Sequence, residues 1–192
     1  MPVALELVSI QKNNAEQKSE GEAMPSDTEF GCVFCRTGQE EEVARRMEHD
    51  YPGLKAVVAM KKRFRRSQGV ETEEKVILFP GYVFFQCSPD SNIREITKRD
   101  NVYKLLTDGG GNWKLLGADK VIASHFVTCG GVIGFSKAYY KGERIRIIDG
   151  FLKQYEGNIV RVNHRAKTAQ VKVQLDGKCF SIWVGFEIIN TL

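Results

Sequence analysis

The sequence feature that most constrains the fold is the segment 75–85, Lys-Val-Ile-Leu-Phe-Pro-Gly-Tyr-Val-Phe-Phe, an apolar run with one interruption. Pro80 has no amide hydrogen to donate to a sheet, so it predicts a strand end, an edge or a bulge, with extended backbone at Phe79. Gly81 permits an unusual backbone conformation before the aromatic and β-branched residues resume. The segment therefore predicts two strands joined at a Pro-Gly turn, and such a run is more often a core strand than a binding surface.

Length and composition place the chain among ordinary globular proteins. Its 192 residues suffice for one large or two small domains, and 42% hydrophobic with 27% charged residues is typical of a packed, water-soluble chain. No window approaches the roughly 20 apolar residues of a membrane span, and the first residues lack the basic region of a signal peptide. We therefore expect a cytoplasmic protein without membrane contact.

Charge is distributed unevenly along the chain. Residues 1–29 contain two lysines against six acidic residues and have little apolar patterning after Ile10, which predicts a disordered acidic extension. The whole chain nevertheless carries a net charge of +4, so the remainder is strongly basic. An excess of this kind suggests an anionic partner, of which nucleic acid is the commonest.

The candidate catalytic and metal-ligating residues do not form a recognisable site. Cys32 and Cys35 form a Cys-x-x-Cys pair, but no second pair follows, and on a strand their spacing sends the two thiols to opposite faces. The three histidines are scattered, and the acidic residues 40–42 fit the start of a helix, where the helix dipole favours them. We therefore expect no cofactor, no metal and no enzymatic activity.

Residues 30–129 predict a small α/β domain. Thr37 and Glu40 have the spacing of a capping box at the start of a helix that ends before Pro52-Gly53. Strands are expected at residues 30–36, 54–60 and 102–106, and further helices at residues 92–99 and 117–127. The inward positions expected of the first two helices are Val43, Ala44, Met47, Ile93, Ile96 and Thr97. The order of elements predicts a sandwich of helices on an antiparallel sheet.

A basic segment lies between two of these strands. Residues 67–69 predict a turn, so the segment is one side of a hairpin that projects from the sheet. Such a charge run is usually a solvated arm, but cations interleaved with an aromatic residue also suit phosphate tracking and base stacking. The candidate nucleic-acid-binding residues are Lys61, Lys62, Arg63, Phe64, Arg65 and Arg66.

The last third of the chain has a different pattern. Residues 130–141 predict a linker, apolar enough to dock on a domain. Short strands then recur at residues 143–148, 157–163, 169–175, 179–184 and 187–189. Five short strands separated by turns predict a small closed β-barrel, which forms a second domain at residues 142–192.

Three motifs in series resemble one protein family. They are Phe79-Pro80-Gly81-Tyr82-Val83, the strand and Thr37-Gly38 turn before the Glu-rich helix, and a motif in the barrel. The barrel motif reads Gly142-Glu143-x-Ile145-x-Ile147-x-x-Gly150, followed by Glu156-Gly157-x-Ile159-x-x-Val162. In order and spacing these resemble the NusG family of transcription elongation factors over residues 30–192. The resemblance implies an amino-terminal NGN domain at residues 30–129 and an SH3-like KOW barrel at residues 142–192.

The resemblance also implies function and partners. A monomeric, non-enzymatic factor is expected, which binds RNA polymerase, contacts nascent RNA or DNA in the elongation complex, and modulates pausing, termination and antitermination. The implied polymerase-binding residues are Phe30, Phe79, Pro80, Gly81, Tyr82 and Val83. The barrel is expected to recruit a ribosomal protein or a termination factor through Gly150, Phe151, Leu152, Tyr155, Leu175 and Lys178.

The chain departs from the family pattern at three places. Phe30-Gly31 stands where the family usually has Trp-Tyr, and the barrel loops near Gly150 and Asp176 lack the common family residues. Together with the basic hairpin, these departures favour a specialised, operon-specific antiterminator of the LoaP or RfaH type. The alternative is a KOW-type RNA-binding protein of the ribosome or of RNA processing that makes no polymerase contact.

Overall fold

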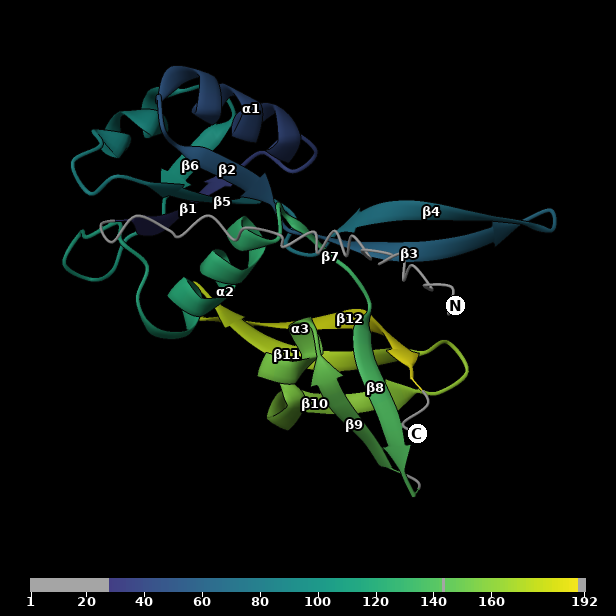
Figure 1. Cartoon of the computed structure of the whole chain (residues 1–192). Helices are drawn as coiled ribbons and strands as arrows, with labels where there is room; N and C mark the ends of the chain where they lie inside the picture. Colours follow the sequence, from purple (N-terminus) through teal and green to yellow (C-terminus); the bar gives the residue numbers. More distant parts are fainter. Residues whose placement is uncertain (1–27, 143, 190–192) are drawn as a thin grey trace, which may run out of the picture.

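The computed structural model describes residues 28–142 and 144–189, without the side chains of residues 64–67, 71 and 144. The expected acidic extension therefore lies, except for its last two residues, outside the described residues. Two bodies of secondary structure follow one another along the chain, and they lie against each other (Figure 1). No helix among the described residues is long and apolar enough to span a bilayer.

The first domain is built on a four-stranded antiparallel sheet with the order β2-β5-β1-β6. Its strands are β1 (Glu29–Cys35), β2 (Lys55–Val58), β5 (Tyr82–Cys87) and β6 (Val102–Leu105). Gly31 pairs with Phe85, whose ring occupies the space that a side chain at Gly31 would need. Both faces of the sheet are buried, which explains why β5 is buried at every position and apolar at all but Gln86.

The two faces of this sheet carry different helices. On one face lie α1 (Glu40–Asp50) and the 3₁₀ helix η1 (Ile93–Lys98), packed around Val33, Val83 and Phe85. On the other lies α2 (Gly117–Thr128), packed around Phe84. Cys32 and Cys35 belong to opposite cores, which confirms the prediction that their thiols point to different faces.

Three local predictions in this domain were wrong. Thr37 does not cap α1; the preceding residue is Gln39, and Glu40 instead accepts a hydrogen bond from the Gly38 amide at 2.8 Å. The second helix is a 3₁₀ helix without a side-chain cap. Its Thr97 is exposed and donates its hydroxyl hydrogen to the Arg94 carbonyl, because the shorter turn places only Ile93 and Ile96 inward.

The predicted hairpin is present as a long arm. It consists of β3 (Met60–Ser67) and β4 (Val70–Ile77), and the short strand β7 (Val132–Ile133) pairs with the base of β3. The turn has positive φ at Gln68 and Gly69. Figure 1 shows the arm extending well beyond the rest of the first domain.

The second domain is a curled five-stranded sheet with the order β10-β11-β12-β8-β9. Its elements are β8 (Ser136–Lys141), β9 (Arg144–Asp149), α3 (Phe151–Gln154), η2 (Glu156–Asn158), β10 (Ile159–Asn163), β11 (Thr168–Leu175) and β12 (Lys178–Ile188). Three predictions differ here. The last two expected strands are one continuous strand, β12, and the expected linker supplies β8. The barrel also stays open, because the strand order leaves β9 and β10 at its two edges.

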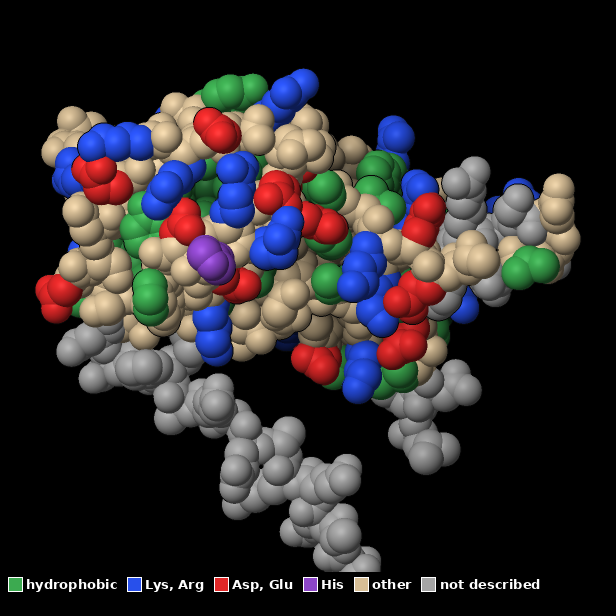
Figure 2. All heavy atoms as spheres, turned by 90° about the horizontal axis from the view of Figure 1, so that it is seen from above, with side chains coloured by type: hydrophobic (Ala, Val, Ile, Leu, Met, Phe, Trp, Pro, Cys, Tyr) green, Lys and Arg blue, Asp and Glu red, His purple; other side chains and the backbone are tan. Residues whose placement is uncertain are grey.

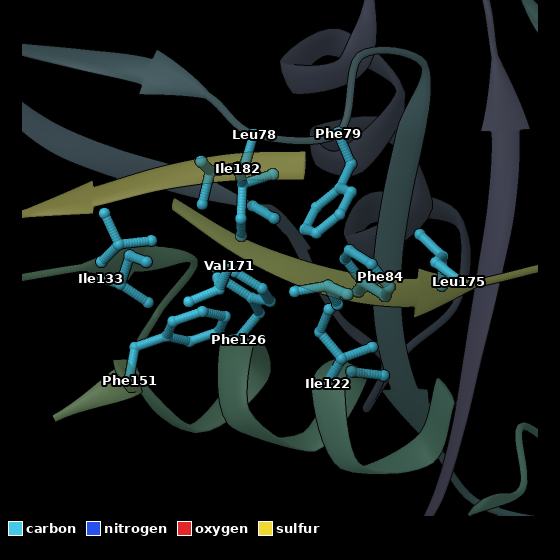
Figure 3. Packing of buried hydrophobic residues seen from close by; sticks show 14 of the residues in the cluster. Leu78, Phe79, Phe84, Ile122, Phe126, Ile133, Phe151, Val171, Leu175 and Ile182 are labelled. Atoms are coloured by element: carbon cyan, nitrogen blue, oxygen red, sulfur yellow. The ribbon is translucent and has the colours of Figure 1, made fainter. Parts of the chain in front are cut away.

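A single apolar core joins the two domains. It contains Phe79, Phe84, Ile122 and Phe126 from the first domain together with a set from the barrel, Phe151, Val171, Leu175, Ile182 and Phe186. Figure 3 shows these side chains, apart from Phe186, converging between α2, β5 and the barrel strands. The barrel therefore completes the core on the α2 face of the first sheet.

Candidate functional site

The Pro-Gly turn at the centre of the sequence is held in place by a buried carboxylate. Glu40 is 1% exposed, and its Oε1 accepts a hydrogen bond from the Gly81 amide at 2.7 Å. Gly81 has φ of +84°, and a Cβ there would lie 2.8 Å from the Phe34 ring. The turn therefore requires glycine both for its conformation and for its close contact, and it fixes Phe79 and Tyr82 relative to the sheet.

The structure divides the residues predicted to bind polymerase. Phe30, Phe79 and Tyr82 lie in the core shared with the barrel, whereas Val83 lies on the opposite face, under α1. Gly81 is buried and Pro80 is exposed. Of the residues predicted to bind polymerase, only Phe30, Phe79 and Tyr82 therefore lie on the side of the sheet that faces the barrel.

Phe180 of the barrel inserts into this surface. Its ring centroid lies 5.2 Å from that of Phe79 and 5.8 Å from that of Tyr82, both in edge-to-face geometry. Phe34 lies beside Tyr82, with 5.1 Å between centroids. Edge-to-face pairs of this kind contribute about 0.5 to 1.5 kcal/mol each beyond the burial of their area. The aromatic residues Phe79 and Tyr82 of the first domain are therefore covered by Phe180 of the second.

Lys178 adds a polar contact to the same surface. Its Nζ lies 3.2 Å from the Tyr82 hydroxyl and 5.8 Å from the centre of the Phe34 ring. The hydrogen bond to Tyr82 raises the pKa of Lys178 above its ordinary value. The ammonium group therefore stays charged while it rests on the two rings.

A second apolar contact joins α2 to α3. The Phe151 ring lies 5.8 Å from that of Phe126 and 5.2 Å from that of His125, and Tyr155 stacks on its other side at 4.7 Å. Burial lowers the pKa of His125 and raises that of Tyr155 to about 12. Both side chains are therefore uncharged at neutral pH in this arrangement.

Polar contacts surround these two apolar ones. Lys104 pairs with Asp176 at 3.1 Å, and the Asp176 amide lies 3.2 Å from a carboxylate oxygen of Asp119. Burial raises the pKa of Asp119, and the charge of Asp176 adds to that rise. At the base of the arm, Lys61 donates a hydrogen bond to the Trp183 carbonyl at 2.5 Å.

The residues predicted to recruit a partner to the barrel lie at or next to this interface. Phe151, Leu152 and Leu175 are buried in the shared core, Tyr155 packs on it, and Lys178 contacts Tyr82. Gly150 begins α3 with φ of +87°, and a Cβ there would meet Ser136 at 2.8 Å. The two surfaces predicted separately from the sequence, one in each domain, therefore cover each other.

The arm is less basic than the segment 61–66 alone suggests, because acidic residues of the opposite strand pair with its cations. Lys62 pairs with Glu73 at 3.0 Å, and Arg63 pairs with Glu74. Burial lowers the pKa of Lys61, whose amine already faces the barrel. Figure 2 shows basic and acidic side chains next to each other towards the arm. The side chains of Phe64, Arg65 and Arg66 lie outside the described set.

Sequence reasoning missed three residues that form the interface: Phe34, Phe126 and Phe180. Phe34 and Phe126 read as ordinary core positions of a strand and a helix. Phe180 follows Cys179 in an expected barrel strand, where an apolar residue is unremarkable. No signal in the chain showed that these side chains belong to one cluster, because they are far apart in sequence.

The fold and the interface define a two-domain protein with an α/β sandwich and a small barrel docked on its sheet. Residues 30–123 match the NusG family model, described as transcription termination factor NusG. The match covers the first domain, which is therefore a NusG-type domain, and this indicates a role in transcription. No curated protein matches the chain.

A solved structure supports the fold. The chain resembles NusG of Thermotoga maritima, in a structure described as showing domain interaction in that protein. The TM-score is 0.50 at 14% sequence identity, and the match covers 82% of this chain and 93% of the other. At this identity the likeness concerns the fold alone, and it confirms the predicted α+β class with an NGN domain and a barrel.

Proposed function

We propose that the chain is a cytoplasmic, non-enzymatic elongation factor that binds RNA polymerase through the aromatic surface formed by Phe34, Phe79 and Tyr82. The observation that carries the proposal is the burial of this surface by a separable domain. Phe79 is 0% and Tyr82 2% exposed, and both contact Phe180 of the barrel. Clustered aromatic side chains of this kind are typical anchors of protein interfaces.

In this arrangement the barrel covers the proposed polymerase-binding surface of the first domain. A partner reaches Phe79 and Tyr82 only after the barrel leaves, and the same movement frees Phe151, Leu152 and Leu175 of the barrel. The first surface would then hold polymerase while the second recruits a ribosomal protein or a termination factor. The basic arm remains outside the interface beyond Lys61 and would contact nucleic acid in the elongation complex.

Release of the barrel would therefore expose both proposed binding surfaces at the same time. A dependence on opening suits a specialised, operon-specific antiterminator, because a signal in the transcription complex would have to release the barrel. A factor needed on every transcript would gain nothing from the closed state. This finer role, in pausing and antitermination, is the function that we assign.

A single-round transcription assay tests the proposal. Purified RNA polymerase transcribes a template with an intrinsic terminator in the presence of the wild-type protein, of Phe180→Ala, or of Phe180→Ala with Tyr82→Ser. We expect the first substitution to increase read-through and the second to abolish the increase. Equal read-through with all three, and no retention of the protein on immobilised polymerase, would favour a stand-alone RNA-binding protein.

The arm is tested by Lys62→Ser with Arg63→Ser. If it contacts nucleic acid, these substitutions reduce the affinity for RNA or DNA and lower its salt dependence, whereas Glu73→Gln with Glu74→Gln increases both. Unchanged affinity in both variants would mean that the arm is a solvated hairpin.

A further inference from the structure

The open seam of the barrel contains a groove between its two edge strands. The edge strands β9 and β10 leave a groove of about 560 Å³ between them. Its floor is apolar and consists of Ile145, Ile147, Ile159, Val162, Ala169 and Phe186. The strand edges on both sides are free of β-ladder partners among the described residues, so the groove offers polar backbone groups above an apolar floor.

Two aromatic rings lie at one end of this groove. Tyr140, at the end of β8, stacks on His164, in the turn after β10, with ring centroids 6.0 Å apart and an angle of 19°. The Tyr140 hydroxyl lies 3.3 Å from His164 Nδ1. Tyr140 is 47% exposed, so its ring is accessible from solvent. The pair joins the β8–β9 hairpin to the β10–β11 hairpin, and both side chains are exposed.

Exposed cations occur on the strands and turns that border the groove and the ring pair. One of them, Arg146, lies 3.9 Å from Glu156, which also faces Lys153 at 3.7 Å. The others have no ion pair within the part of the chain that the structure describes, and they are Lys141, Arg161, Arg165 and Lys167. A surface with several exposed cations beside stacked rings is complementary to a phosphate backbone with accessible bases.

We propose that this seam binds single-stranded RNA, with a base on the Tyr140–His164 pair and phosphates on Arg161, Arg165 and Lys167. A single strand fits because an unpaired base can stack on an exposed ring, whereas the bases of a duplex are already stacked. An acidic peptide would satisfy the cations but would leave the ring pair without a function. The identification of the strand as a nascent transcript rests on the proposed function, since transcription releases RNA unpaired.

The seam stays accessible when the barrel is docked. The interface uses Phe151, Phe180 and Lys178, whereas Figure 1 shows the β10–β11 turn at the end of the barrel away from α2. RNA binding at the seam therefore does not require opening. It would hold the closed protein on a transcript before the polymerase surface is exposed.

Fluorescence anisotropy with a labelled single-stranded RNA of about twelve nucleotides tests the site on the full chain without polymerase. We expect Arg161→Ser, Arg165→Ser and Lys167→Ser together to weaken binding at least about tenfold and to reduce the slope of log K against log salt by about 2. The matched control changes three exposed cations of the first domain, Arg36→Ser, Arg94→Ser and Lys98→Ser. It removes the same charge and should weaken binding less than about threefold.

A second pair of variants tests the rings independently of charge. Tyr140→Ala should weaken binding by about five- to fiftyfold, whereas Tyr140→Phe, which keeps the stacking face, should retain the wild-type affinity. Equal loss in the charge variant and its control, or no loss in Tyr140→Ala, would overturn the proposal.

Competitors separate the possible ligands. Displacement of the RNA by a glutamate-rich peptide as effectively as by unlabelled RNA would identify an acidic peptide as the occupant, and tighter binding of single-stranded DNA or duplex RNA would also contradict the proposal. Because polymerase is absent, RNA binding that depends on Tyr140 would stand even if the chain failed to bind polymerase. Loss of RNA binding would in turn leave the polymerase proposal intact.

Discussion

The two faces of the first-domain sheet are covered in different ways. On one face, Val83 and Phe85 lie under α1 and η1, which belong to the same domain. On the other, Phe79 and Tyr82 lie partly under α2 and partly under Phe180 of the barrel. A strand with apolar residues on both sides can thus serve a permanent core on one side and a separable interface on the other.

The largest effect is expected on the permanent face. Phe85 is 0% exposed and stacks on Trp113 with centroids 5.7 Å apart. Phe85→Ala should therefore lower the free energy of unfolding by about 3 to 5 kcal/mol, because it leaves a cavity under α1. Equilibrium unfolding in urea measures the change. A loss below about 1 kcal/mol would mean that this face is not the main core of the domain.

The next effect is expected at the separable face. Phe180→Ala should weaken docking by about 2 to 3 kcal/mol while both domains stay folded, because it removes the ring between Phe79 and Tyr82. Small-angle scattering should show a larger radius of gyration. The control is Ser181→Ala on the neighbouring exposed position, which should leave the radius unchanged. A compact Phe180→Ala variant would show that other contacts dominate the interface.

A smaller effect should follow pH. Burial lowers the pKa of His125 below its ordinary 6.5, and because its ring contacts Phe151 of the barrel, we expect docking to favour the neutral ring. This contribution is present above pH 6.5 and is lost as the pH falls through 6.5 to the lowered pKa. Asp119 acts in the opposite direction in the more acidic range near its raised pKa, since its protonated form is favoured in the interface.

A titration of the His125 ring protons by NMR checks this sign. The pKa of His125 should be higher in Phe180→Ala than in the wild type, because the opened interface rehydrates the ring. With His125→Phe, docking should become insensitive to pH between about 7.5 and 5.5. An identical pKa of His125 in the closed and opened proteins would show that α2 alone buries the ring.

The smallest effect is expected at the polar rim. Lys104 and Asp176 form a half-exposed ion pair, and a double-mutant cycle with Lys104→Ala and Asp176→Ala should give a coupling energy of about 1 kcal/mol or less for docking. The coupling should decrease at high salt. A larger value that resists salt would indicate that the charged rim, rather than the aromatic contact, holds the barrel.

The sequence predicted the elements better than their assembly. The Pro-Gly turn, the long hairpin and the opposite faces of Cys32 and Cys35 followed from local conformational preferences and strand periodicity. The docking of the barrel did not, because the side chains that form it are spread from Phe34 to Phe180. The sequence pattern of an apolar strand residue does not show whether the residue packs within its own domain or against another domain.

The candidate sites show the same limit. The apolar and basic segments were recognised, but the ion pairs of Lys62 and Arg63 with the opposite strand depend on hairpin register, which sequence fixes only once the turn is known. The Tyr140–His164 pair was missed because it joins two hairpins across an open seam, whereas the pattern of short strands predicted a closed barrel.

The dissociation constant for purified core RNA polymerase, compared between the wild type and Phe180→Ala, tests whether polymerase binds the surface under the barrel. Because Phe180 covers the proposed anchor without belonging to it, we expect tighter binding by the opened variant, by tenfold or more if opening costs about 1.4 kcal/mol or more in the wild type. Tyr82→Ser in the opened background should remove that gain. Equal or weaker binding by Phe180→Ala would show that the surface under the barrel is not where polymerase binds.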